Sequence, residues 1–197
     1  MNRVHRLLRS LNCDGRFGVA LLAGCALLIV PSLWGEHAQL LLRYERGGLA
    51  QGQWWRLVSM HVIHLGPRHA LANALALALL WALFARDYSP RAWTLILVTA
   101  AAAVDAGLWF LASTVTWYAG SSGVLHGVLA AGAVAHVRRG ERDGWPLLVL
   151  LAAKLAYEQG VGGLPFSGTV VVVDAHLYGV VGGLAACAFL KPRAGSL

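Results

Sequence analysis

Two side chains that could together perform acyl transfer lie in glycine-rich stretches of an otherwise apolar chain. Ser122 lies within Gly120-Ser121-Ser122-Gly123, and His176 lies within 174-DAHLYGVVGG-183. A serine hydroxyl becomes a strong nucleophile when a base takes its proton, and histidine is the side chain suited to this near neutral pH. Taken singly, each residue is also compatible with a packing role in a membrane helix. Taken together, they predict Ser122 as nucleophile and His176 as general base.

A second polar pair, His69 and Asn73, is spaced four residues apart and therefore shares one helix face. Both side chains can donate hydrogen bonds to an oxyanion, with the Ser122 backbone N–H as a third donor. The competing interpretation is a metal site, because His61, His64 and His69 are close in sequence. No Cys, Asp or Glu near them completes a tetrahedral set. We therefore expect an oxyanion hole, with no metal and no cofactor.

The rest of the sequence has the composition of a membrane protein. Of its 197 residues, 58% are hydrophobic and only 13% are charged. The apolar residues form long runs separated by short charged patches, which is typical of a multi-span membrane domain. We expect an all-α membrane protein with one domain over residues 1–197 and six spans, near 17–34, 69–86, 92–112, 119–137, 145–160 and 170–190.

The basic residues predict the orientation of these spans. The net charge is +7, and eleven of the sixteen Lys and Arg residues fall at the two chain ends or after the second and fourth spans. The positive-inside rule then places both termini in the cytoplasm. The basicity thus indicates topology, and we exclude nucleic-acid binding. The first span lacks a small-x-small cleavage site, so an uncleaved signal-anchor is expected. The three cysteines are scattered, and no disulfide is expected.

The segment between the first two spans, residues 35–73, is too polar to cross a membrane and too rich in Leu, Trp and Val for a free loop. We expect an amphipathic segment in the outer interface, with Trp54 and Trp55 at headgroup level. An ordinary extracellular loop is the alternative.

The predicted orientation brings the polar residues to one depth. The second, fourth and sixth spans all begin on the outer side, so His69, Asn73, Ser122 and His176 would lie within roughly 10 Å of the outer surface. Independent polar residues would be scattered in depth. Glycines four residues apart give both the fourth and the sixth span a smooth face, at Gly123 and Gly127 and at Gly179 and Gly183. Packing of these two faces would bring Ser122 and His176 within reach of each other.

With these motifs, the chain resembles the rhomboid family of intramembrane serine proteases over nearly its whole length. The matching features are six spans, Trp55-Arg56, His69-x-x-x-Asn73, G-x-S-G and Ala175-His176-x-x-Gly179. The resemblance implies a six-helix bundle and a Ser122–His176 dyad without a carboxylate, with His69, Asn73 and the Ser122 N–H lining the oxyanion hole. Gly120, Gly123 and Gly179 would support the site.

Within the family, the chain is most similar to the rhombosortase subgroup. The stretches that carry this similarity are 123-GVLHG-127, 154-KLAYEQ-159 and 173-VDAHLYG-179. Many rhomboids carry a tyrosine four residues after the serine, stacked on the catalytic histidine. His126 stands there in this chain, and a planar imidazole can still stack.

The subgroup resemblance also implies partners and a location. The substrates would be exported proteins anchored by a C-terminal Gly-Gly signal, a hydrophobic helix and a basic tail, with cleavage near the glycine pair and possible transfer to a lipid-derived amine. The enzyme would lie in a bacterial inner membrane with its active site open to the periplasm. The alternatives are a generic rhomboid protease that cleaves transmembrane substrates, a non-catalytic rhomboid-like binder and a small transporter or channel.

Four further ionisable residues lie in or near the predicted spans. Lys154 and Glu158 are four residues apart, which permits an ion pair or a substrate contact. Asp105 has no assignable partner. Asp174 lies about 200° around the helix from His176, which disfavours it as a third catalytic residue.

Overall fold

The chain is mostly helical, as predicted. The computed structural model describes residues 3–163 and 172–194. The α-helices are α1 (Arg3–Ser10), α2 (Gly15–Ile29), α3 (Gly35–Leu42), α4 (Arg46–Ala50), α5 (Arg56–Ser59), α6 (Pro67–Phe84), α7 (Pro90–Ala106), α8 (Ser122–Arg139), α9 (Gly144–Val161) and α10 (Asp174–Phe189). A 3-10 turn, η1 (Val30–Trp34), follows α2, and a π-helical turn, η2 (Gly107–Leu111), follows α7. Two short strands, β1 (Tyr44–Glu45) and β2 (Trp117–Tyr118), pair antiparallel with Tyr44 opposite Tyr118.

Within the described residues, three helical stretches are long and apolar enough to cross a membrane: Gly15–Leu42, Pro67–Phe84 and Pro90–Leu111. Helix α10 is apolar but shorter. Helices α8 and α9 have 18 residues each but carry polar side chains, including His126 and His136 on α8 and Lys154 and Glu158 on α9. The molecule therefore has the apolar helices of a membrane-embedded protein, and the count of six spans remains a prediction.

Several helix ends differ from the predicted span ends. The fourth span was expected from residue 119, but α8 begins at Ser122, because residues 117–118 form β2 and Gly120 adopts a φ of 136°. The first was expected to run to residue 34, yet α2 ends at Ile29. Pro31, which cannot donate a backbone hydrogen bond, is the second residue of the 3-10 turn η1, which leads the chain into α3. The predicted start of the sixth span at residues 170–171 lies outside the described residues, and α10 begins at Asp174.

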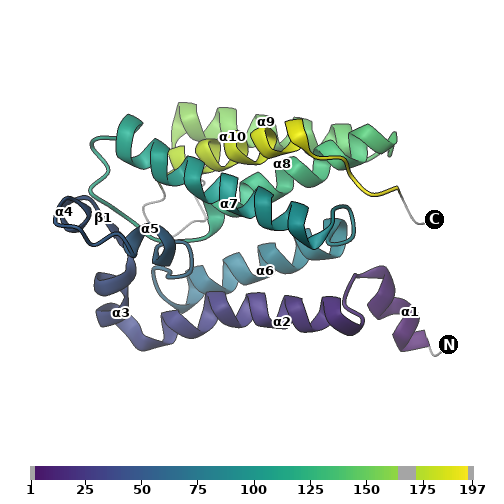
Figure 1. Cartoon of the computed structure of the whole chain (residues 1–197), viewed down its shortest axis with the longest axis horizontal. Helices are drawn as coiled ribbons and strands as arrows, with labels where there is room; N and C mark the ends of the chain where they lie inside the picture. Colours follow the sequence, from purple (N-terminus) through teal and green to yellow (C-terminus); the bar gives the residue numbers. More distant parts are fainter. Residues whose placement is uncertain (1–2, 164–171, 195–197) are drawn as a thin grey trace.

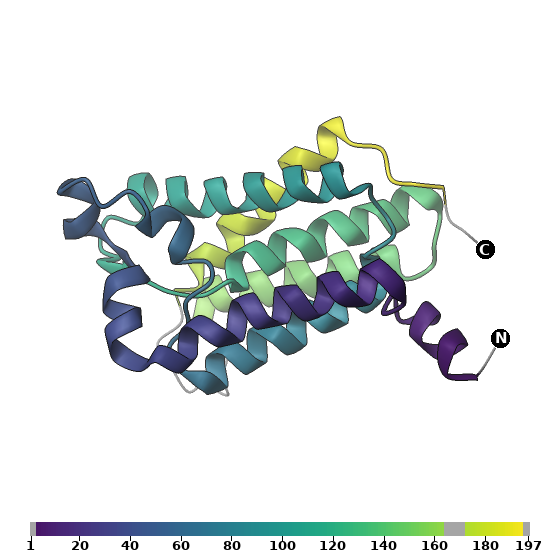
Figure 2. The same ribbon diagram turned by 60° about the horizontal axis from the view of Figure 1, so that its bottom comes forward.

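The helices α6, α8 and α10 all begin at the same end of the molecule, next to α3, α4 and α5 (Figure 1). The two ends of the chain lie at the opposite end, and the turned view in Figure 2 shows the same arrangement. Residues at the starts of α6, α8 and α10 therefore share one level of the bundle.

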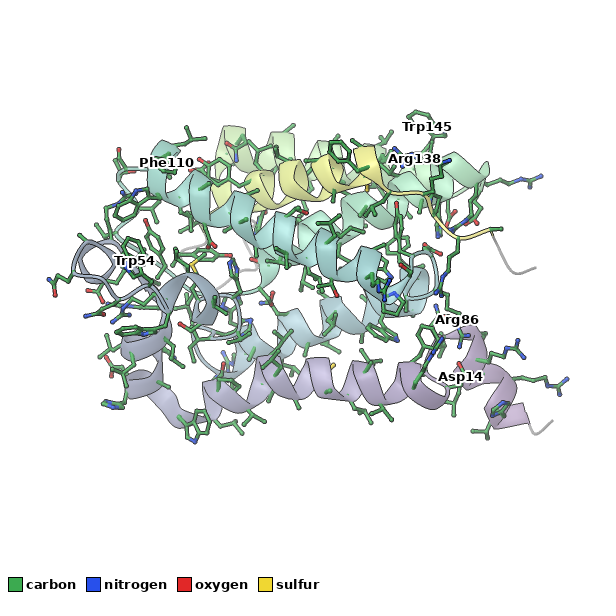
Figure 3. The ribbon with its side chains drawn as sticks, viewed as in Figure 1. Asp14, Trp54, Arg86, Phe110, Arg138 and Trp145 are labelled. Atoms are coloured by element: carbon green, nitrogen blue, oxygen red, sulfur yellow. The ribbon has the colours of Figure 1, made fainter. Side chains whose placement is uncertain are left out.

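The end of the molecule near the chain termini carries a network of charged side chains. Arg86 pairs there with Asp14, as Figure 3 shows. Asp87 and Glu141 both accept hydrogen bonds from Arg139, at 2.9 and 2.6 Å. A cavity of about 440 Å³ lies among these groups. This concentration of arginines agrees with the charge pattern from which a cytoplasmic end was predicted.

The segment between α3 and α6 is held by buried arginine hydrogen bonds. Arg56 is only 6% exposed and donates to Gln53 Oε1 at 2.6 Å and to the carbonyls of Leu40 and Arg43 at 2.9 and 2.8 Å. Trp54, which lies in Figure 3 at the end of the molecule opposite the chain termini, is exposed, as is its neighbour Trp55. An ordered segment with exposed tryptophans fits the predicted interfacial position, which stays a prediction.

Arg46 joins this segment to η2, the π-helical turn that follows α7. Its guanidinium donates to the carbonyl oxygens of Leu108, Trp109 and Ala112 at 2.5, 3.1 and 3.1 Å. The last carbonyls of a helix have no partner within the helix. Arg46 supplies those partners, so it caps the π-helical end of this span.

Candidate active site

Ser122 and His176 meet as the sequence predicted. Ser122 is the first residue of α8, and His176 is the third of α10. The imidazole Nε2 lies 3.0 Å from Ser122 Oγ, which is hydrogen-bonding distance. The histidine is buried, whereas Ser122 keeps partial exposure. A serine hydroxyl in hydrogen-bonding contact with an imidazole is the arrangement that acyl transfer requires.

The glycine faces of α8 and α10 produce this contact. A Cβ atom built on Gly179 would lie 1.8 Å from the carbonyl oxygen of Gly123, and one built on Gly183 would lie 2.3 Å from that of Gly127. Neither position can carry a side chain while the helices stay at this separation. The prediction that two glycine faces would bring Ser122 to His176 is therefore confirmed.

A carboxylate lies on the far side of His176. Glu158 Oε2 is 2.9 Å from His176 Nδ1, and Lys154 Nζ donates to Glu158 Oε1 at 2.5 Å. The ion pair permitted by the spacing in α9 is thus formed. The resemblance implied a dyad without a carboxylate, and here the structure differs. Glu158 lies on α9 and His176 on α10. Spacing within α9 could therefore suggest Lys154 as a partner of Glu158, but not His176.

His126 stacks on His176, as the sequence allowed. The two imidazoles lie 4.1 Å apart between ring centroids, with an interplanar angle of 17°. His126 Nδ1 donates to the carbonyl oxygen of Ser122, one turn earlier, at 2.7 Å. This bond fixes the ring orientation, so the stack limits the rotation of His176.

His69 is oriented as an oxyanion donor would be. The backbone N–H of Leu65 donates to His69 Nδ1 at 3.3 Å, so the neutral ring carries its proton on Nε2. The ring lies against Gly120, where a Cβ would be 2.9 Å from His69 Cε1 and 3.4 Å from Nε2. Gly120 is therefore required both for its positive φ and for the space taken by His69.

Asn73 reaches the same end of the site through Ser121. Its side-chain oxygen accepts from Ser121 Oγ at 3.2 Å, and its Nδ2 donates to the carbonyl of His69 at 3.0 Å. The second hydrogen on Nδ2 can serve another acceptor. The ring of His64, which is fully buried, lies with Nε2 3.2 Å from Ser121 Oγ. The sequence did not suggest a role in the site for Ser121 and His64. Their contact joins positions 57 residues apart, which no local spacing reveals.

The three clustered histidines have separate partners. His61 Nε2 lies 3.1 Å from Asp105, which thereby gains the partner that the sequence did not suggest. His64 contacts Ser121, and His69 contacts Leu65. Among the described residues, the side-chain groups with metal-like spacing are elsewhere: His126, Glu158 and His176, and His136, Glu141 and Asp143. The geometry thus favours the oxyanion interpretation of His69 over a site built from His61, His64 and His69.

Comparison with known proteins agrees with this geometry. The rhomboid domain profile matches residues 51–193, which include every residue of the site. The chain is also 30% identical over 159 residues to "Rhomboid protease GluP" of Bacillus subtilis (strain 168). That alignment covers 77% of this chain but only 29% of the relative. The chain belongs to the rhomboid family. Its similarity to the rhombosortase subgroup stays a prediction.

Proposed function

We propose that this protein is an intramembrane serine endopeptidase. The observation that carries the proposal is the 3.0 Å contact between His176 Nε2 and Ser122 Oγ, at the start of two helices locked together by glycines. Family membership supports the same reaction. Ser122 is the proposed nucleophile and His176 the proposed general base.

The reaction would proceed by acyl transfer in two steps. His176 Nε2 takes the proton of Ser122 Oγ as the oxygen attacks the scissile carbonyl carbon. The C–N bond then breaks, and the imidazolium gives its proton to the leaving amine. In the second step, His176 takes a proton from water as the water oxygen attacks the acyl-enzyme carbonyl carbon. The bond between this carbon and Ser122 Oγ then breaks, the imidazolium returns its proton to Oγ, and a carboxylic acid leaves. The same proton transfer from an amine would give an amide instead.

The negative charge on the tetrahedral oxygen would be stabilised at the helix starts. The proposed donors are the Ser122 backbone N–H, His69 Nε2–H and the remaining hydrogen of Asn73 Nδ2. The N–H groups of a first helical turn have no intrahelical partner and lie at the positive end of the helix dipole. Such donors act most strongly where water is excluded.

The proposed setting is a bacterial inner membrane, crossed by six spans of one domain over residues 1–197. Both termini would be cytoplasmic and the site would open to the periplasm. The support is the position of the chain ends opposite the starts of α6, α8 and α10, together with the arginines at the terminal end (Figure 1).

The proposed substrates are membrane-anchored exported proteins with a C-terminal Gly-Gly signal, a hydrophobic helix and a basic tail. This narrower proposal rests on the subgroup resemblance around His126, Glu158 and His176. A generic transmembrane substrate is the alternative, and a substrate series decides between them.

The test uses a reporter that carries the Gly-Gly tail, co-expressed with the full-length chain. Cleavage should occur with the native protein and with the exposed-residue controls Ser113→Ala and His37→Ala, and should be lost in Ser122→Ala and His176→Ala at equal protein levels. A serine-reactive fluorophosphonate should label the native protein but not Ser122→Ala. Cleavage by Ser122→Ala, or the absence of labelling, would refute the catalytic proposal and leave a binder or transporter.

Two further measurements define the reaction and the substrate. Replacing the Gly-Gly pair with Leu-Leu should abolish cleavage, and unchanged cleavage would refute the Gly-Gly preference alone. The mass of the new C-terminus separates water from an amine as the acceptor, because a free acid means hydrolysis and an added group means transfer.

A further inference from the structure

We infer that Glu158 is a positioning residue that completes a Ser122–His176–Glu158 triad, and that Lys154 fixes the carboxylate. The inference rests on the proposed serine-protease function and goes beyond it, because a Ser–His dyad requires neither residue. It rests on three hydrogen bonds that join α8, α9 and α10 in one line, at 3.0, 2.9 and 2.5 Å.

The first step of the argument is the tautomer of His176. A carboxylate only accepts hydrogen bonds, so the contact between Glu158 Oε2 and Nδ1 requires a proton on Nδ1. The neutral ring then has a lone pair on Nε2, the atom that faces Ser122 Oγ. This is the tautomer that can take the serine proton. Without a partner at Nδ1, the ring could carry its proton on Nε2 and be unable to act as base.

The second step is the charge that develops during catalysis. When Nε2 takes the serine proton, the ring of His176 becomes a positively charged imidazolium. The side chains of His176 and Glu158 are only 6% and 3% exposed, so water contributes little to the stabilisation of this cation. The carboxylate supplies the compensating charge at 2.9 Å.

The third step is the cost of burying Glu158. An ionisable side chain inside a membrane protein is unfavourable unless it is paired, and a buried ion pair seldom stabilises a fold more than apolar residues of similar size would. The Lys154 side chain is 30% exposed and reaches the carboxylate from one turn earlier in α9. It occupies Oε1, which leaves Oε2 directed at His176. A positioning role explains why both charges lie here.

This arrangement predicts that Glu158→Gln changes the tautomer of His176. A glutamine has one oxygen and one NH₂ group in place of two oxygens, and Lys154 has only donors. The oxygen would therefore turn to Lys154 and the NH₂ group to His176 Nδ1. That contact holds the proton on Nε2, which is the wrong tautomer. In the double variant Lys154→Met/Glu158→Gln, the oxygen is free to face His176, and part of the activity should return.

The experiment measures fluorophosphonate labelling of the full-length chain in detergent micelles, separating the inactivation rate constant from the probe affinity. Glu158→Gln should lower the rate constant about 100-fold or more, since removal of the triad carboxylate in well-studied serine proteases costs about 10⁴-fold. The probe affinity should stay within about twofold. The double variant should recover about tenfold over Glu158→Gln, because the correct tautomer becomes available. Glu158→Asp should retain more activity than Glu158→Gln.

Asp105→Asn is the matched control, because Asp105 also contacts a histidine, His61 of the first loop, but neither residue touches Ser122, His176 or Glu158 in the hydrogen bonds described above. It should label at the native rate. A merely structural role for Glu158 would reduce the folded fraction and leave the rate constant of the folded protein unchanged. A rate constant within threefold of native in Glu158→Gln, or a double variant no faster than the single one, would overturn the inference.

A second readout needs no enzymatic activity. In protein with ¹⁵N-labelled histidine, the Nδ1 and Nε2 shifts of His176, assigned by comparison with His176→Gln, report the tautomer. The inference requires a protonated Nδ1 in the native protein and a protonated Nε2 in Glu158→Gln. If the native protein is not labelled by the probe, the proposed function fails while this measurement still decides the position of the proton. If labelling is normal but the tautomer does not change, only the role of Glu158 fails.

Discussion

The interlocked glycines of α8 and α10 allow a quantitative prediction for Gly179→Ala. The added Cβ would lie 1.8 Å from the carbonyl oxygen of Gly123, and backbone on both sides leaves no flexible side chain to move away. To reach even 3.0 Å, the helices must separate by about 1.2 Å. The same displacement at the catalytic pair would stretch the 3.0 Å contact between Ser122 and His176 beyond about 4 Å, outside hydrogen-bonding distance.

Two measurements should therefore change together. A misplacement of about 1 Å between catalytic groups can cost about 100-fold in rate, so fluorophosphonate labelling of Gly179→Ala should slow by roughly that factor. Overpacking of this kind should also lower the free energy of unfolding by about 1–3 kcal/mol. Thermal unfolding in detergent measures the second effect, on the same sample.

Gly160→Ala is the control, because a Cβ at Gly160 in α9 meets no atom within 4 Å. It should leave the labelling rate unchanged and should not lower the free energy of unfolding, because alanine favours a helix more than glycine does. If Gly179→Ala labels at the native rate and unfolds at the native temperature, the close approach of the two helices does not determine the Ser122–His176 distance, and the packing argument is wrong.

Three further predictions follow from other parts of the structure. His126→Ala removes the ring stacked on His176 and should slow labelling about tenfold, whereas His126→Phe keeps an aromatic ring and should lose less; equal rates in both would contradict a stacking role. Arg56→Ala leaves buried carbonyls without a donor and should cost about 2–4 kcal/mol in the free energy of unfolding, with Arg56→Lys intermediate, so an unchanged melting temperature would be inconsistent with this network. The hydrogen bond from Arg139 holds the pKa of Glu141 below its usual 4.5, so the carboxylate stabilises the fold above about pH 4.5 and loses this effect as the pH falls through its folded-state pKa. Because Glu141 is partly exposed, this contribution should be under about 1 kcal/mol, and the difference in melting temperature from Glu141→Gln should shrink between pH 7 and pH 3; a constant difference would argue against the ion pair.

The sequence predicted those parts of the site that depend on helix periodicity and on glycine spacing. The four-residue glycine intervals in 123–127 and 179–183 determine which faces can approach closely, so the meeting of Ser122 and His176 followed from the pattern alone. The stack of His126 on His176 was suggested by the family resemblance, because many rhomboids carry a stacked tyrosine at this position.

Contacts between segments far apart in the sequence could not be predicted from spacing within one helix. For Glu158 the sequence suggested an ion pair with Lys154 or a substrate contact, but not the contact with His176, which lies on another helix. Asp105 remained unassigned because His61 lies in the first loop, whose path depends on hydrogen bonds from Arg46 and Arg56. The start of α8 was placed three residues too early, because hydropathy does not reveal that residues 117–118 pair with residues 44–45.

The cap that Arg46 places on η2 couples two regions that would otherwise move independently. Several carbonyls at this helix end share one guanidinium, so detachment of the loop would remove a hydrogen-bond donor from all of them at once. Detachment of the loop and fraying of the helix end should therefore be a single cooperative event. Backbone amides in both regions should exchange with deuterium at similar rates, and loop substitutions should alter protection of residues 107–112 at a distance.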